Sequence, residues 1–144
     1  VNIQFMPSTE LPAARVGVAD IGAPVPFGAL QGSITLRAPT GFTFHSIFNG
    51  ADRTYPCVGI MLEVAGHEPG DLDAKFKTPS DIRCLVFPPD FSELQITMSG
   101  AKVLRAGVPY RLVALVRNPL DPQKASPWVL LTHMMKVGMD NEIP

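Results

Sequence analysis

Apolar and polar residues alternate with a period of two wherever apolar residues are dense in this chain. Such alternation is typical of half-buried β-strands, and it predicts about eight short strands. The clearest runs cover residues 1–5, 33–37, 42–45, 58–64, 82–86, 94–99, 110–116 and 128–135. No long helical pattern separates these runs, and only single helical turns fit, near residues 80–84 or 88–94. The sequence therefore predicts an all-β fold, an antiparallel β-sandwich of the immunoglobulin-like or Greek-key type with few or no helices.

The alternation also assigns residues to faces of the predicted strands. Ser33, Thr35 and Glu63 lie opposite their apolar neighbours, so we expect them on the polar faces of their strands. The run 110–116 is apolar on both faces, which is typical of a central strand.

Four residues around the last two runs are expected to specify the fold. Gly107 can adopt the positive φ of a turn, and Pro119 ends the strand because it has no N–H to donate. Tyr110 resembles the corner tyrosines of Greek-key sandwiches, whose hydroxyl bonds to a nearby loop, although simple packing at a sheet edge explains it equally well. Trp128 opens the closing strand.

Length and charge restrict the class of protein. A chain of 144 residues fits one sandwich domain, residues 1–144. The chain begins without Met and without a signal-peptide pattern, which suggests a processed chain or one module of a larger protein. The 12 Lys and Arg are scattered and the net charge is −1, which gives no support for binding nucleic acid. No apolar stretch reaches the length of a membrane-spanning helix.

Cys57 and Cys84 are the two cysteines of the chain, and each lies in a strand-like run. A disulfide between them would join neighbouring strands or the two sheets and, in the chain-entropy model, stabilise the fold by roughly 3.5 kcal/mol. The alternative is two buried thiols that pack as small apolar groups.

The polar residues show no established catalytic or metal-binding motif. The three histidines are far apart and no nucleophile motif occurs, so we expect no enzyme and no cofactor. Zinc ligands at the usual spacings are missing. Glu68, Asp71 and Asp73 form a weak candidate Ca²⁺ site, but the Pro69-Gly70 turn explains this polar stretch as well.

Aromatic residues are the candidate ligand-binding groups. Phe27 and Tyr55 lie in turn-rich segments where a ring can be exposed to a sugar. The wider set of rings that could form a stacking platform, or simply fill the core, is Phe42, Phe44, Phe48, Tyr55 and Trp128.

Three sequence phrases support a resemblance: "LRAPTGFTF", the separated cysteines, and "LRAGVPYRLVALVRNP" followed by Trp128. Together they resemble β-sandwich, immunoglobulin-like modules of large, uncharacterised surface or secreted proteins of single-celled algae and related protists. The match covers residues 30–132 and carries no catalytic residue. It implies an extracellular or cell-surface module.

The expected function is therefore a non-enzymatic structural or protein-interaction module of an extracellular assembly, with other proteins or copies of itself as partners. A carbohydrate-binding module is the alternative hypothesis, and an enzyme is the third. We also expect one terminus to lie against an open sheet edge, either of its own sandwich or of a neighbouring copy.

Overall fold

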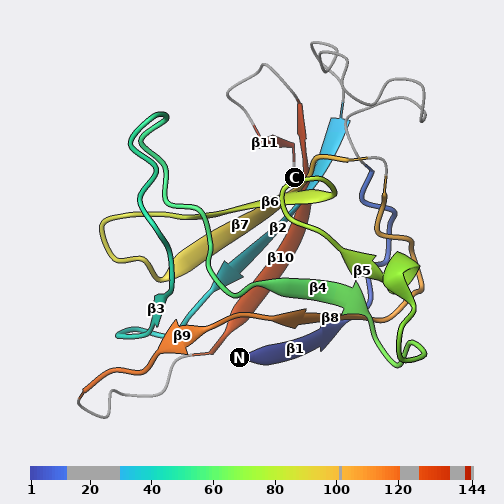
Figure 1. The fold of residues 1–144 in the computed structure, drawn as a ribbon, viewed down its shortest axis with the longest axis horizontal. Helices are drawn as coiled ribbons and strands as arrows, with labels where there is room; N and C mark the ends of the chain where they lie inside the picture. Colours follow the sequence, from blue (N-terminus) through green and yellow to red (C-terminus); the bar gives the residue numbers. More distant parts are fainter. Residues whose placement is uncertain (13–29, 101, 121–126, 137–141, 144) are drawn as a thin grey trace.

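The computed structural model describes residues 1–12, 30–100, 102–120, 127–136 and 142–143, and within these it is all-β. Figure 1 shows two antiparallel sheets, one across the other. The four-stranded sheet has the order β1-β8-β4-β5. Its strands are β1 (Asn2–Phe5), β8 (Tyr110–Val113), β4 (Met61–Val64) and β5 (Lys75–Phe76).

The five-stranded sheet has the order β11-β10-β2-β7-β6, and its named pairs are antiparallel. Its strands are β11 (Glu142–Ile143), β10 (Val129–Lys136), β2 (Leu30–Arg37), β7 (Glu93–Met98) and β6 (Ile82–Val86). A short third pair joins β3 (Thr43–Phe44) to β9 (Val116–Arg117). The all-β prediction is confirmed, and the strands outnumber the eight expected because several of them have only two residues.

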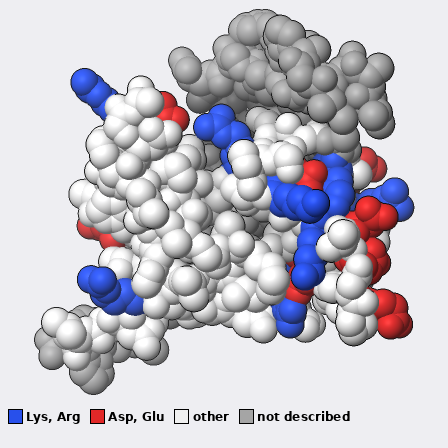
Figure 2. Space-filling model, viewed as in Figure 1, with Lys and Arg blue, Asp and Glu red and all other residues white. Residues whose placement is uncertain are grey.

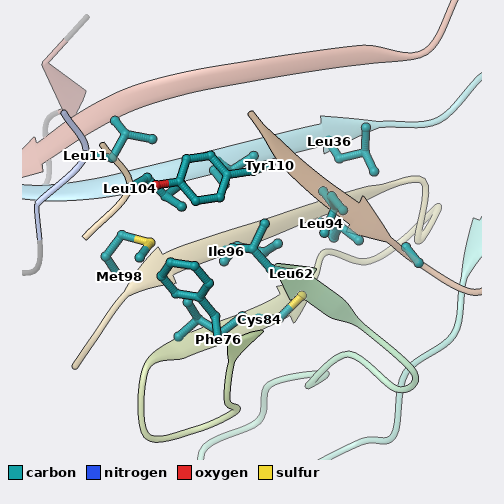
Figure 3. Close-up of a cluster of buried hydrophobic side chains, with 14 of the residues drawn as sticks. Leu11, Leu36, Leu62, Phe76, Cys84, Leu94, Ile96, Met98, Leu104 and Tyr110 are labelled. Carbon is teal, nitrogen blue, oxygen red and sulfur yellow. The ribbon is translucent and has the colours of Figure 1, made fainter. Parts of the chain in front are cut away.

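The core lies between the inward faces of the two sheets. From the five-stranded sheet come Leu36, Leu94, Ile96 and Met98, and from the four-stranded sheet come Leu62, Phe76, Tyr110 and Leu112. Figure 3 shows several of these side chains meeting between the ribbons, with Cys84 at one border and Leu11 and Leu104 at another. The period-two pattern places them there, because alternate residues of a strand point to the same face.

Both termini pair with their own sheets. β1 runs along the edge of the four-stranded sheet in register with β8, from Asn2 opposite Val113 to Phe5 opposite Tyr110. The amino group of Val1 donates to the Ala114 carbonyl over 2.8 Å. At the other end, β11 pairs with β10 at the edge of the five-stranded sheet. The expected terminal strand on a sheet edge is thus present, within one copy of the chain.

Three details differ from the sequence expectations. Among the described residues, a 3₁₀ turn forms at Leu72–Ala74, which is in neither predicted segment. The run 58–64 is a strand only from Met61, because Gly59 has a φ of +74° that ends regular pairing. The run 110–116 divides into β8 and β9, although β8 does lie centrally, between β1 and β4.

A fourth difference concerns polar residues. Ser33, Thr35 and Glu63 lie on the outward side of their strands, yet all three are buried. Ser33 and Thr35 belong to β2, which has a neighbouring strand on each side. Glu63 is covered by charged neighbours, described below.

Candidate functional site

A β-hairpin, residues 45–58, projects from the border of the sandwich at the upper left of Figure 1. Its two arms are joined by bridges at Ser46–Cys57 and Asn49–Thr54. The tip is closed by side chains: the Asn49 carboxamide oxygen accepts from the Ala51 N–H, and Asp52 accepts from both the N–H and the hydroxyl of Thr54. The Thr54 hydroxyl bond is the main reason that the pKa of Asp52 is lowered.

The hairpin continues the five-stranded sheet. Its second arm lies beside β6, where the Val86 N–H donates to the Tyr55 carbonyl and the Cys57 N–H donates to the Cys84 carbonyl. Cys57 and Cys84 also form a disulfide, with a Cα–Cα distance of 5.4 Å. The predicted disulfide is confirmed, and it fastens the hairpin to the sheet edge at a position where the backbones already pair.

A hollow of about 420 Å³, which we call the aromatic hollow, lies at the base of this hairpin. Four of its lining residues are aromatic: Phe44, Phe48, Tyr55 and Phe91. The ring centroids of Phe48 and Tyr55 are 5.0 Å apart, and those of Tyr55 and Phe91 are 4.9 Å apart in an edge-to-face arrangement. Phe44 is buried, whereas Phe48 is 54% exposed. Phe48, Tyr55 and Phe91 therefore form a row of contacting rings that reaches solvent at Phe48, and Phe44 adds a buried ring to the lining.

The other lining residues of the aromatic hollow are polar or basic: Thr43, His45, Ser46 and Arg117. Thr43 and Arg117 are register partners in the β3–β9 pair. No carboxylate is among the described residues that line this hollow; Asp90 lines a neighbouring one that shares Thr43. The hollow thus combines aromatic rings with two hydroxyl groups and one guanidinium. Such a lining suits a ligand that has an apolar face and polar or anionic substituents.

The structure gives different outcomes for the predicted aromatic candidates. Tyr55 does line a hollow, whereas Phe27 lies outside the described residues. Phe42 and Phe44 pack their rings against Trp128, at centroid distances of 5.4 and 6.2 Å. Phe42 and Trp128 therefore pack in a ring cluster with Phe44, and of these three only Phe44 is among the described residues that line the hollow.

Sequence reasoning missed His45, Phe91 and Arg117 as members of this site. They come from segments far apart in the sequence, and no spacing links them. One signal was available for the hairpin itself: Asn49-Gly50 between alternating residues is a strong turn signature.

A second group of interacting side chains lies on the outward face of the four-stranded sheet. The Glu63 carboxylate accepts a hydrogen bond from the Arg111 guanidinium, and its other oxygen lies 2.6 Å from His67 Nε2. These two bonds, that of Arg111 first, hold the pKa of Glu63 below its ordinary value, against the opposing effect of burial. A bond to the Glu68 carbonyl, and then the bond to Glu63, raises the pKa of His67.

This group is a structural ion network. The Glu63 side chain is 2% exposed and therefore offers little access to a substrate. Figure 2 shows charged side chains gathered on this side of the molecule, whereas the side with the hairpin, β3 and β9 is mostly uncharged.

A second hollow, of about 450 Å³, is lined by residues that include Phe76, Lys102, Arg105 and Tyr110. The Lys102 ammonium donates to the carbonyls of Asp73 and Lys75 and lies 3.8 Å from the Asp81 carboxylate. The Lys102 ammonium therefore already stabilises the turn before β5, and this makes Lys102 less available to bind a ligand.

The candidate Ca²⁺ ligands lie in the turn that precedes β5 and form hydrogen bonds within it. The Asp71 carboxylate caps the 3₁₀ turn by accepting from the Asp73 N–H over 3.1 Å. Glu68 contributes its carbonyl, which accepts from His67 and from the Asp71 N–H. Within the described residues, no three His, Cys, Asp or Glu side chains are grouped so as to hold a metal ion.

The four residues that were expected to specify the fold lie in or beside turns and strand ends. Gly107 has a φ of +75°, and its N–H donates to the Pro7 carbonyl. The Tyr110 hydroxyl accepts from the Arg105 N–H over 2.8 Å, which is the geometry of a tyrosine corner. β9 ends at Arg117, two residues before Pro119, and Trp128 immediately precedes β10.

Comparison with protein-family models, with curated proteins and with solved structures finds no match to this chain. In the described residues, no helix has the length and apolar character needed to cross a membrane.

Proposed function

We propose that the chain is a non-enzymatic structural and protein-interaction module of an extracellular or cell-surface assembly, with copies of itself as partners. The observation that supports this proposal most directly is that the hairpin 45–58 is attached to β6. An isolated two-stranded hairpin is marginally stable in water, but here a disulfide and backbone bonds to β6 hold it in place. A disulfide of this kind also fits an oxidising, extracellular compartment.

The outer face of the hairpin presents apolar side chains to solvent. Ile47 is 68% exposed and Val58 is 36% exposed, and they occupy adjacent positions on the same face, since residues 45 and 47 pair with 58 and 56. Leu115, 49% exposed, lies directly over Gly59 beside them. Large apolar groups that project together in this way are typical of protein contact surfaces.

Sedimentation velocity over a range of concentrations tests this function. The wild-type chain is expected to associate, and Ile47→Ser is expected to weaken association. The matched control is Leu72→Ser, which changes a residue of similar exposure, 64%, in the 3₁₀ turn far from the hairpin. A wild-type chain that stays monomeric throughout, or an Ile47→Ser variant that associates as strongly, contradicts the proposal.

A second function, carbohydrate binding, is supported by the opposite face of the same hairpin. There Phe48 and Tyr55 offer ring surface to the aromatic hollow, and exposed rings are the usual surface on which sugar rings stack. Binding of an oligosaccharide that Phe48→Ala weakens, while Ile47→Ser does not, would separate this function from self-association. Equal binding by all three chains contradicts it.

A further inference from the structure

We infer that the aromatic hollow selects an anionic saccharide, one whose pyranose rings carry carboxylate or sulfate groups. This inference rests on the carbohydrate-binding function proposed above and names its ligand class. It depends on three features of the hollow: the ring surface, the guanidinium of Arg117, and the charge balance of the lining.

The ring surface comes first. Phe48, Tyr55 and Phe91 offer apolar ring surface, with the rings inclined at 47° and 78° to their neighbours. The C–H face of a pyranose is the part of a sugar that can cover a ring without losing hydrogen bonds. The hollow of about 420 Å³ lies within the range of small-molecule sites and is open to solvent along Phe48. An oligosaccharide can therefore enter with one residue and continue outside.

The guanidinium comes second. Arg117 is exposed, and among the residues that the structure describes, no hydrogen bond or ion pair engages its side chain. Other arginines are used differently: Arg37 pairs with Glu93, and Arg111 pairs with Glu63. A planar guanidinium in the lining of a hollow that also holds aromatic rings is suited to a bidentate bond with a carboxylate or a sulfate.

The third feature is charge balance. Besides Arg117, the described lining contains two titratable residues, His45 and Tyr55, and neither is a carboxylate. No described carboxylate lines the hollow itself; Asp90, one residue before Phe91, lines the neighbouring hollow. On the face seen in Figure 2, Lys and Arg are sparse on the side of the hairpin, β3 and β9, so the preference does not come from a general basic surface.

Isothermal titration with three oligosaccharides of equal length tests the inference: an oligouronate, a sulfated galactan fragment and a neutral galactan fragment. Inorganic sulfate is titrated as a fourth probe. We expect the two anionic sugars to bind at least tenfold more tightly than the neutral one, and inorganic sulfate to bind more weakly than either, since it cannot stack on the rings.

Two variants locate the site, each checked for a native melting transition. Arg117→Gln should weaken binding of the anionic sugars about tenfold and leave the neutral sugar unchanged, because a bond to a charged group is lost. Phe48→Ala should weaken all three sugars about fivefold. Arg105→Gln, an exposed arginine of the second hollow, is the matched control and should change nothing.

The outcomes separate the inference from the function on which it rests. Equal binding of anionic and neutral sugars that still depends on Phe48 overturns the charge selection and keeps the carbohydrate-binding function. No sugar binding overturns both. Anionic binding that Arg117→Gln does not affect, or inorganic sulfate that binds as tightly as the sugars, also overturns the inference.

Discussion

Glu63 of β4 and Arg111 of β8 are register partners, and their side chains form an ion pair on the outward face of the four-stranded sheet. The two partners differ in exposure: the carboxylate is 2% exposed and the Arg111 side chain is 38% exposed. If the pair is broken, Arg111 can therefore turn toward water, whereas Glu63 stays covered with His67 as its remaining partner.

This asymmetry predicts unequal effects of the two single substitutions. Arg111→Met should lower the free energy of unfolding by about 2–3 kcal/mol, because it leaves a buried carboxylate with one hydrogen bond fewer. Glu63→Gln should cost about 1 kcal/mol, because the amide still accepts from Arg111 and the guanidinium reaches solvent. Urea denaturation of both variants and of the double variant measures the two costs and their coupling. Equal costs would show that the exposure difference has no energetic consequence.

The same network predicts how stability depends on pH. The pKa of Glu63 is lowered in the fold, so its contribution is fully present above the ordinary value of 4.5 and is lost as the pH falls through the lowered pKa. The pKa of His67 is raised, so its contribution is fully present below the ordinary value of 6.5 and is lost as the pH rises through the raised pKa. Both contributions are complete only between pH 4.5 and 6.5.

The geometry of His67 supports the alkaline side of this prediction. Nδ1 lies 2.8 Å from the Glu68 carbonyl and Nε2 lies 2.6 Å from the Glu63 carboxylate, and both partners are acceptors. Only a doubly protonated imidazole can donate to both. Melting temperatures between pH 4 and 9 should fall above pH 6.5 for the wild type and less for His67→Gln, with His45→Gln as the exposed control. Parallel curves for the wild type and His67→Gln would contradict this role.

Local patterns predicted the strands and turns well, because each depends on a few neighbouring residues. Alternation placed Leu94, Ile96 and Met98 on the inward face, and Gly107 has the turn conformation that its residue type favours. The aromatic hollow could not be predicted in the same way. Phe44, Tyr55 and Arg117 meet only after the β3–β9 pair has formed and the hairpin has joined β6, and alternation within a strand gives no partner strand. The burial of Glu63 likewise depends on the register between β4 and β8.

The disulfide predicts a large and specific sensitivity to reductant. Reduction should lower the free energy of unfolding by about 3.5 kcal/mol, because the closed segment between Cys57 and Cys84 regains its freedom in the unfolded chain. The backbone bond from Cys57 to Cys84 and the Tyr55–Val86 bond do not involve sulfur, so the fold itself should remain. Guanidinium denaturation with and without dithiothreitol measures the difference. A variant with both cysteines changed to Ala should be insensitive to dithiothreitol, and a wild type that is equally insensitive would contradict the stabilising role.

The N-terminal strand predicts the effect of a truncation. Val1, Ile3 and Phe5 pack against the core, and the Phe5 ring lies 5.9 Å from that of Tyr110. Deletion of residues 1–6 removes these half-buried side chains and should cost about 3 kcal/mol of unfolding free energy. It also leaves β8 as an unpaired edge, since β8 lies between β1 and β4. Exposed strand edges pair with other chains, so the truncated protein should be both less stable and more prone to associate.

A synthetic peptide with the sequence of residues 1–6 distinguishes loss of the strand from a general defect of the truncated chain. Added to the truncated protein, the peptide should restore the melting temperature and reduce association to the level of the full-length chain, because main-chain pairing with β8 and the contacts of Ile3 and Phe5 with the core are both available. A peptide in which Ile3 and Phe5 are replaced by Ser keeps the backbone donors but lacks the apolar side chains, and it should fail. Restoration by both peptides would mean that backbone pairing alone closes the edge. Restoration by neither, together with a truncated protein of unchanged stability, would show that β1 contributes nothing to the sandwich.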